Sequence, residues 1–268
     1  MIARFLLTLA LLAAGPLPLL AQSPAESVLS HRIIPGWTQA DGTRLAALEL
    51  TLAQGWKTYW RAPGDAGIPP DFDWRGAGNL SAVHVHWPAP FVFWQSGMRS
   101  VGYKNRVVLP LSVVPEDPGR EVRLKGRVDL GICSDICVPA SIDVDAVLPA
   151  ATKARSPSIV AALAALPLTA QEAGVTRTVC RLTPTSSGMQ IEAHVTVPPI
   201  GGDEDAVIEP PAPGIWVSDA VARRTGNDLV VTAEMIGPTQ APLLIDRARV
   251  RITLIGSTHA VDIRGCTG

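Results

Sequence analysis

The sequence predicts an all-β protein in which two β-sandwich domains are joined by a linker with one short helix. Three observations favour this class. Short runs that alternate, or that are rich in β-branched residues, recur along the chain without long helices between them. Turn-forming residues are abundant, with 23 glycines and 24 prolines. Hydrophobic residues make up 47% and charged residues 18% of the 268-residue chain, so it can bury a substantial core.

The first segment has the composition of a secretory signal peptide. Arg4 precedes an apolar run over residues 5–20, and small and polar residues follow at 21–23. A transmembrane anchor is the alternative, but the run is short for a span of ~20 residues and two prolines interrupt it. We therefore expect a signal peptide over residues 1–21, a mature chain that begins near Gln22, and export from the cytoplasm.

The first predicted domain covers residues 22–149. Glycine, proline and aspartate separate its strand patterns, as in the segments PGDAGIPPD and VPEDPG. Strands at this spacing, without helices between them, are typical of a β-sandwich. The predicted strands cover residues 45–52, 83–87, 107–114, 122–130 and 142–148.

The linker, residues 150–170, contains the helical pattern. Ser156 followed by Pro157 is typical of a helix start, and the alanine- and leucine-rich run 159–166 ends at Pro167. Strand patterns then resume and predict a second β domain. Its range is 171–268, and its predicted strands cover residues 178–182, 189–197, 229–234, 243–246 and 250–255.

Charge and motif content argue against several functions. The formal net charge of −1 leaves no basic surface for nucleic acid, so no nucleic-acid partner is predicted. No GxSxG, HExxH or P-loop pattern occurs. The acidic stretch GGDEDA at 201–206 is interpreted as a solvated loop. His84 and His86 share one strand face and could ligate a metal with cysteines, but the simpler interpretation is a solvated surface, and we predict neither cofactor nor metal.

Two of the four cysteines are far apart in the sequence. Cys180 and Cys266 lie near the first and last strand patterns of the second domain. In an exported chain a bond between them would close a large loop and contribute up to ~4 kcal/mol in the chain-entropy model. We predict a structural disulfide here; free or intermolecular cysteines are the alternative.

The other two cysteines, Cys133 and Cys137, are four residues apart in the segment GICSDICVP. On a helix this spacing would hold the Cβ atoms about 5–6 Å apart, too far for a disulfide. A strand that leads into a turn at Ser134 and Asp135 would bring the sulfurs together. So small a ring adds little stability, and strained or exposed disulfides exchange readily. We therefore predict a redox pair, with a structural clip and a metal site as alternatives.

Four longer segments occur in an order that is found in one family. They are GWKTYWRAPGDAGIPPDFDW at 55–74, WPAP at 87–90, GYKNRVVLPL at 102–111 and DLGICSDICVPAS at 129–141. Together they resemble the N-terminal periplasmic domain of the thiol:disulfide interchange protein DsbD, and more closely its copper-tolerance (ScsB-type) branch, over about residues 30–149. The resemblance implies a periplasmic, immunoglobulin-like β-sandwich that carries a reversible cysteine pair.

The resemblance also implies partners and site residues. In that family the domain takes electrons from a membrane-embedded reductase, of the DsbD or CcdA type, and passes them to oxidised periplasmic thioredoxin-like proteins. Carried onto this chain, Cys133 and Cys137 are the redox pair. An aromatic cap falls at residues 91–95, with Phe93 as the first candidate for the shield and Trp94 as the next. The alternative is that these aromatic residues are ordinary core anchors.

The sequence departs from full-length DsbD in two respects. Its cysteines have three residues between them, where DsbD has a longer spacer, and neither a membrane span nor a thioredoxin-type CxxC follows. We therefore expect electrons to be supplied in trans, to a component of a protein-disulfide reductase system. The competing functions are a copper- or metal-binding protein that uses the same cysteines and a non-catalytic β-sandwich adaptor.

Overall fold

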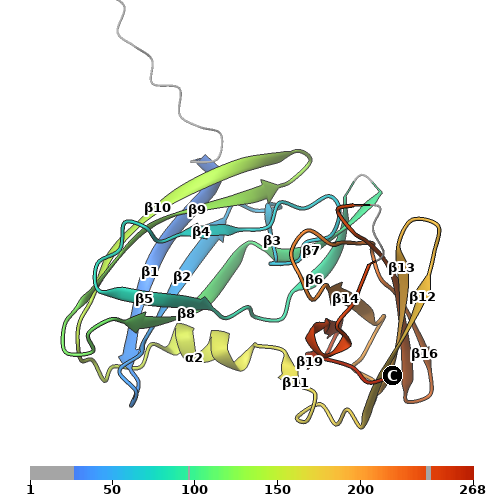
Figure 1. Cartoon of the computed structure of the whole chain (residues 1–268). Coiled ribbons are helices and arrows are strands. Elements are labelled where there is room, and N and C mark those ends of the chain that lie inside the picture. Colours follow the sequence, from blue (N-terminus) through green and yellow to red (C-terminus); the bar gives the residue numbers. More distant parts are fainter. Residues whose placement is uncertain (1–26, 96, 240–242) are drawn as a thin grey trace, which may run out of the picture.

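The computed structural model of the chain describes residues 27–95, 97–239 and 243–268. It consists of two β-sandwiches side by side, with a helix between them in the chain (Figure 1). The all-β fold with a short linker helix is therefore confirmed. The predicted signal peptide, residues 1–21, lies outside the described residues. Within the described ranges, no helix has both the length and the apolar character needed to cross a membrane.

The first sandwich packs two antiparallel sheets around one core. Leu48 and Leu109 from one sheet meet Leu130 and Ile142 from the other, and all four are buried. One sheet has the order β1 (Leu29–Thr38), β2 (Arg44–Leu52), β8 (Arg106–Pro115), β5 (Leu80–Val85). The other has the order β10 (Cys137–Leu148), β9 (Val122–Cys133), β3 (Lys57–Tyr59), β7 (Met98–Lys104), β6 (Phe91–Gln95), and β4 (Asp71–Asp73) also pairs with β9.

The second sandwich has its own core, in which Ile191 and Val231 from one sheet meet Ile252 and Val261 from the other. Alternating buried residues along its strands produce this inward face. One sheet has the order β11 (Leu168–Thr169), β19 (Ala260–Arg264), β18 (Arg251–Ile255), β14 (Asp205–Glu209). The other has the order β12 (Arg177–Pro184), β13 (Met189–Thr196), β17 (Asp228–Ile236), β15 (Trp216–Val217), and β16 (Val221–Thr225) also pairs with β17.

The linker helix α2 (Pro157–Ala164) begins where the sequence predicts it, after Ser156, although the Ser156 side chain makes no capping hydrogen bond. Ile159 and Ala162 are buried against Ala47 and Val108 of the first sandwich. The chain then enters β11, which pairs in parallel with β19. The linker is thus attached to both sandwiches.

One predicted strand is wrong. Residues 243–246 pair with no strand, although Leu243 and Ile245 pack on the second core. The Asp246 side chain instead accepts a hydrogen bond from the backbone N–H of Ala248 and starts the 3-10 helix η1 (Arg247–Arg249). Local side-chain bonding of this kind competes with strand pairing.

The acidic stretch at 201–206 is not the solvated loop that the sequence suggests. Glu204 is bonded to the guanidinium of Arg224 through both carboxylate oxygens, and its side chain is 8% exposed. Asp205 begins β14 and contacts Arg99 of the first sandwich. Both carboxylates are held by partners distant in sequence, which composition alone does not reveal.

Candidate redox site

Cys133 and Cys137 are the last paired residues of the β9–β10 hairpin. They lie directly opposite each other in the antiparallel ladder, with Cα atoms 4.1 Å apart, and form a disulfide. A three-residue turn, closed by the N–H of Ser134 donating to the carbonyl of Ile136, joins them. The strand-and-turn arrangement that the spacing indicates is therefore the one observed.

The two sulfur-bearing residues differ in accessibility. Cys133 is fully buried and packs in a small cluster with Tyr59 and Phe93, whereas Cys137 is exposed at the rim of the sheet. A thiol that approaches from solvent therefore meets Cys137 first. Since exchange requires access to a sulfur, this asymmetry distinguishes the roles that the two cysteines can take.

Tyr59 is the polar group in contact with the pair. Its hydroxyl lies 3.1 Å from Sγ of Cys137 and 3.4 Å from the backbone oxygen of Ala66. Burial raises the pKa of the Tyr59 phenol above its usual value, so the group keeps its proton and remains a donor. The ring crosses β9 at Gly131, where a Cβ atom would lie 2.7 Å from it. Glycine at this position is what admits the tyrosine to the site.

The aromatic residues at 91–95 form a strand rather than a loop. Strands β6 and β7 make a hairpin, here called the cap hairpin (Phe91–Gln95 and Met98–Lys104), along the edge of the sheet that contains β9 and β10. Phe93 is 7% exposed and stacks on Tyr59, with ring centroids 6.3 Å apart. Trp94 points to the opposite face and is 68% exposed. Of the two cap candidates, Phe93 is the one that covers Cys133.

Two further side chains connect the cap hairpin to the cysteine hairpin. Lys57 is the register partner of Cys133, and its ammonium lies 5.4 Å from the centroid of Phe93. Gln95 donates a hydrogen bond to the backbone oxygen of Ser134, in the turn between the cysteines. The cap is thus joined to the disulfide hairpin by stacking, a cation–π contact and a hydrogen bond.

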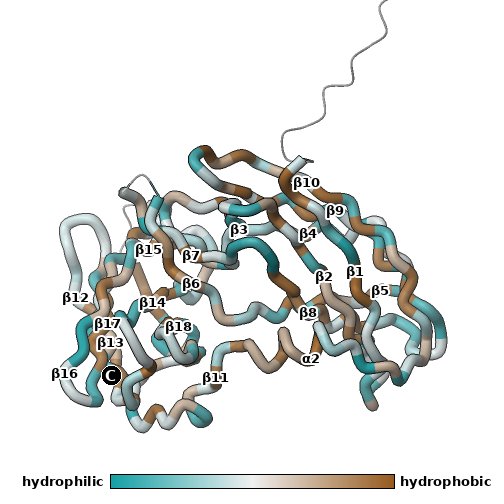
Figure 2. Tube along the Cα trace, turned by 180° about the vertical axis from the view of Figure 1, so that it is seen from behind, coloured by the Kyte–Doolittle hydropathy of each residue, from teal (hydrophilic) through white to brown (hydrophobic). Residues whose placement is uncertain are grey.

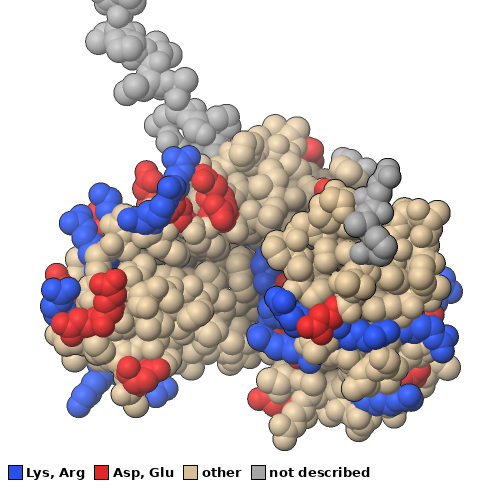
Figure 3. Space-filling model, viewed as in Figure 1, with Lys and Arg blue, Asp and Glu red and all other residues tan. Residues whose placement is uncertain are grey.

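The surface around the pair is apolar. Ile136, in the turn, is 66% exposed, and Met98, on the cap hairpin, is 53% exposed. Figure 2 shows hydrophobic residues beside a hydrophilic stretch at the end of the β9–β10 hairpin. The face in Figure 3 carries few charged side chains there. Exposed apolar side chains gathered at one place are typical of a surface that contacts another protein.

The histidine pair lies away from the cysteines. His84 and His86 come from the end of β5, in the other sheet of the first sandwich. His86 is hydrogen-bonded to the hydroxyl of Ser112 at 2.7 Å. The pKa of His86 is lowered, mainly because the ring is buried and to a lesser extent because His84 is nearby. In the part of the chain that the structure describes, no three His, Cys, Asp or Glu side chains are grouped to hold a metal.

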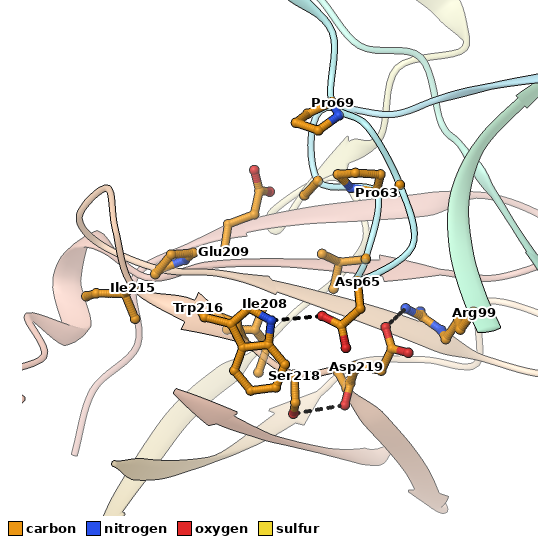
Figure 4. A pocket seen from close by; sticks show the side chains of 17 residues that line it. Pro63, Asp65, Pro69, Arg99, Ile208, Glu209, Ile215, Trp216, Ser218 and Asp219 are labelled. Carbon is orange, nitrogen blue, oxygen red and sulfur yellow. Dashed lines mark hydrogen bonds and ion pairs between the residues drawn. The ribbon is translucent and has the colours of Figure 1, made fainter. Parts of the chain in front are cut away.

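A separate cavity of about 440 Å³ lies between the two sandwiches (Figure 4). Its walls include Asp65 and Arg99 from the first sandwich and Trp216 and Asp219 from the second. Neither Cys133 nor Cys137 lines it. In the second sandwich, Cys180 and Cys266 form a disulfide across 86 residues of chain.

The sequence alone does not single out Tyr59, which lies within the motif GWKTYW. The strand period places Lys57 and Tyr59 on one face, two residues apart. What connects that face to the cysteines is the pairing of β3 with β9, which brings Lys57 opposite Cys133. That register was the missing information.

Comparisons with known proteins match residues 30–149 to a family model and most of the chain to a solved fold. Residues 30–149 match the family model described as "Thiol:disulfide interchange protein DsbD, N-terminal". The N-terminal periplasmic domain of ScsB from Proteus mirabilis has the same fold, with a TM-score of 0.71 at 20% identity, over 92% of this chain and 96% of that one. The reduced N-terminal domain of DsbD from Neisseria meningitidis aligns at a TM-score of 0.26 and 14% identity, over 47% of this chain and 90% of that one, and carries no argument. No curated protein matches the chain.

Proposed function

Residues 30–149 belong to the family of the N-terminal domain of the thiol:disulfide interchange protein DsbD, and from this premise we propose that the chain relays electrons between proteins through Cys133 and Cys137. The observation that carries the proposal is the disulfide at the end of an exposed hairpin, with one sulfur accessible and the other covered by Phe93. A disulfide that spans four residues constrains the unfolded chain little, so its value lies in exchange.

The proposed cycle has two halves. A thiolate of a reduced donor dithiol attacks Sγ of Cys137, the Cys133–Cys137 bond breaks, and Cys133 leaves as a thiolate that takes up a proton. The second donor thiolate then attacks the donor sulfur of the mixed disulfide, so the donor becomes a disulfide and this chain a dithiol. In the reverse sequence, Cys137 attacks the disulfide of an acceptor protein and Cys133 resolves the mixed disulfide. Each cycle moves two electrons and two protons.

Donor and acceptor are proposed from the family. The donor is a membrane-embedded reductase of the DsbD or CcdA type, and the acceptors are oxidised thioredoxin-like proteins of the periplasm. The apolar surface formed by Ile136 and Met98 supports a protein rather than a small molecule as the partner. The ScsB structure, which is that of a periplasmic domain, supports the compartment.

Trapping identifies the exchange route. With Cys133→Ala the remaining Cys137 cannot be resolved internally, so we expect it to accumulate mixed disulfides with periplasmic proteins that a reducing agent releases. With Cys137→Ala the remaining Cys133 is buried, and we expect few or none. Non-reducing electrophoresis with mass spectrometry measures both. If neither variant captures a partner, or Cys133 captures more than Cys137, the route proposed here is wrong.

Tyr59→Phe tests the hydroxyl beside the accessible sulfur. We expect it to slow alkylation of the reduced protein about tenfold at neutral pH and to move the rate–pH curve to higher pH, because a hydrogen bond to a charged group contributes ~1.5–3 kcal/mol. The matched control is Tyr103→Phe, since the hydroxyl of Tyr103 donates to the carbonyl of Pro88. That change should leave the curve in place. Equal curves for Tyr59→Phe and the unchanged protein would contradict the assignment.

A further inference from the structure

The cap hairpin has two differently occupied faces. In its antiparallel ladder Phe93 lies opposite Ser100, and Trp94 lies opposite Arg99. Opposed residues share a face, and successive residues alternate between faces. Phe93 therefore points towards the disulfide and Arg99 points away from it. Yet Arg99 is only 5% exposed, so another part of the molecule must cover it.

The second sandwich covers Arg99. Nη2 of Arg99 donates to Oδ1 of Asp205 at 3.1 Å and to the backbone oxygen of Ala206 at 3.0 Å. Nη1 of Arg99 donates to Oδ1 of Asp219 at 3.3 Å (Figure 4). All three acceptors come from the second sandwich. A buried guanidinium with several charged and neutral acceptors is held in one place, because breaking the set leaves a charge without a partner.

A second connection runs beside the first, through the segment between β3 and β4. The N–H of Val101, on the cap hairpin, donates to the carbonyl of Pro63, and the indole N–H of Trp216 donates to Oδ1 of Asp65 at 2.9 Å (Figure 4). Gly64 fits between these contacts with φ +84°, and a Cβ atom there would lie 3.2 Å from both Arg99 O and Asp219 Oδ1. This segment also supplies the carbonyl of Ala66 that accepts from Tyr59.

We propose that Arg99 is a positioning residue through which the second sandwich holds the cap hairpin over the Cys133–Cys137 disulfide. The second sandwich then acts as a brace: while Arg99 is bound to Asp205 and Asp219, Phe93 stays against Cys133. The Cys133 thiolate that must leave when a thiol attacks the accessible Cys137 then forms in apolar surroundings, so the disulfide is reduced slowly. Release of Arg99 lets Phe93 move away from Cys133 and speeds reduction of the disulfide. This inference rests on the proposed function, in which Cys137 is attacked and Cys133 leaves.

The test measures reduction of the oxidised, full chain by dithiothreitol, followed by alkylation and mass analysis of Cys133 and Cys137. Arg99→Gln should raise the second-order rate constant about tenfold, because it removes charge-assisted hydrogen bonds that keep the closed form dominant. Asp219→Asn should raise it less, and Arg99→Lys should recover part of the slow rate. Phe93→Ala, which removes the cover itself, sets the upper limit.

Two comparisons separate positioning from a general loss of stability. Arg224→Gln removes a similarly enclosed ion pair, with Glu204, that does not touch the cap, and it should leave the rate unchanged. Arg99→Gln combined with Phe93→Ala should be no faster than Phe93→Ala alone, because both changes act through the same cover. If Arg99→Gln does not fold, Asp219→Asn carries the test, since its side chain is already 37% exposed.

Wild-type rates for both Arg99→Gln and Asp219→Asn would overturn the inference, and so would an equal acceleration by Arg99→Gln in the presence and absence of Phe93. The small thiol needs no protein partner, so this result is independent of the trapping experiment. A failure to trap partners together with a faster Arg99→Gln would reject the proposed function and retain the brace.

Discussion

Cys137→Ala should reduce the rate of electron transfer from a donor dithiol to an acceptor disulfide to the uncatalysed background, a loss of at least ~10³-fold. The reason is that the reaction needs both sulfurs, one to form the mixed disulfide and one to resolve it. Cys133→Ala should reach the same background, and the double variant should be no slower than either single variant, as is typical of groups that act as a unit. Turnover of a fluorescent disulfide-bonded acceptor measures all three rates.

The matched control for that loss is the other disulfide. Cys180→Ala combined with Cys266→Ala removes a bond of the second sandwich and should leave the exchange rate close to that of the unchanged protein. Retention of more than a tenth of the rate in Cys137→Ala would show that the pair is not the carrier, and would favour the adaptor function among the alternatives.

Cys180→Ala combined with Cys266→Ala should greatly lower the free energy of unfolding. The Cys180–Cys266 bond closes a loop with a sequence separation of 86, which gives ~4.5 kcal/mol in the chain-entropy relation. The Cys133–Cys137 bond, with a separation of 4, gives ~2 kcal/mol by the same relation. Urea unfolding of this variant and of Cys133→Ala combined with Cys137→Ala, monitored with a probe in each sandwich, measures both losses. A greater loss from the short loop than from the long one would contradict these assignments of roles.

Much of the fold could be predicted because the chain repeats its strand signals clearly. The first part of Val122–Cys133, up to Leu130, and most of Cys137–Leu148 alternate between buried and less buried residues, and this period is visible in the sequence. Arg44–Leu52 is almost continuously buried because the core lies on one side of it and α2 covers part of the other, so it reads as an apolar run. These strands are locally determined, and sequence reasoning found them.

The strands and contacts that sequence reasoning missed depend on partners far along the chain. β1 contains His31, Arg32 and Pro35, and it is a strand because β2 pairs with it. Arg99 lies 106 positions before Asp205 and 120 positions before Asp219, and nothing in the local sequence connects them. Cys133 and Cys137 could be singled out from their spacing in the sequence. Tyr59 and Arg99 required the register of the sheets and the placement of the second sandwich.

The attachment of the linker to both sandwiches has a consequence for how the molecule could be divided. Ile159 of α2 fills an apolar site beside Ala47 and Val108, and Ile255 of β18 packs into the first core. A fragment that ends at residue 149, the last residue of the family match, would keep Cys133 and Cys137. It would lose Ile159 and Ile255 and so expose the apolar side chains of the first sandwich that they cover. The first sandwich is therefore not an independent domain, because it is packed against the helix and the second sandwich. A functional first half would have to include the helix α2. It would also need polar side chains where Ile255 now covers apolar ones.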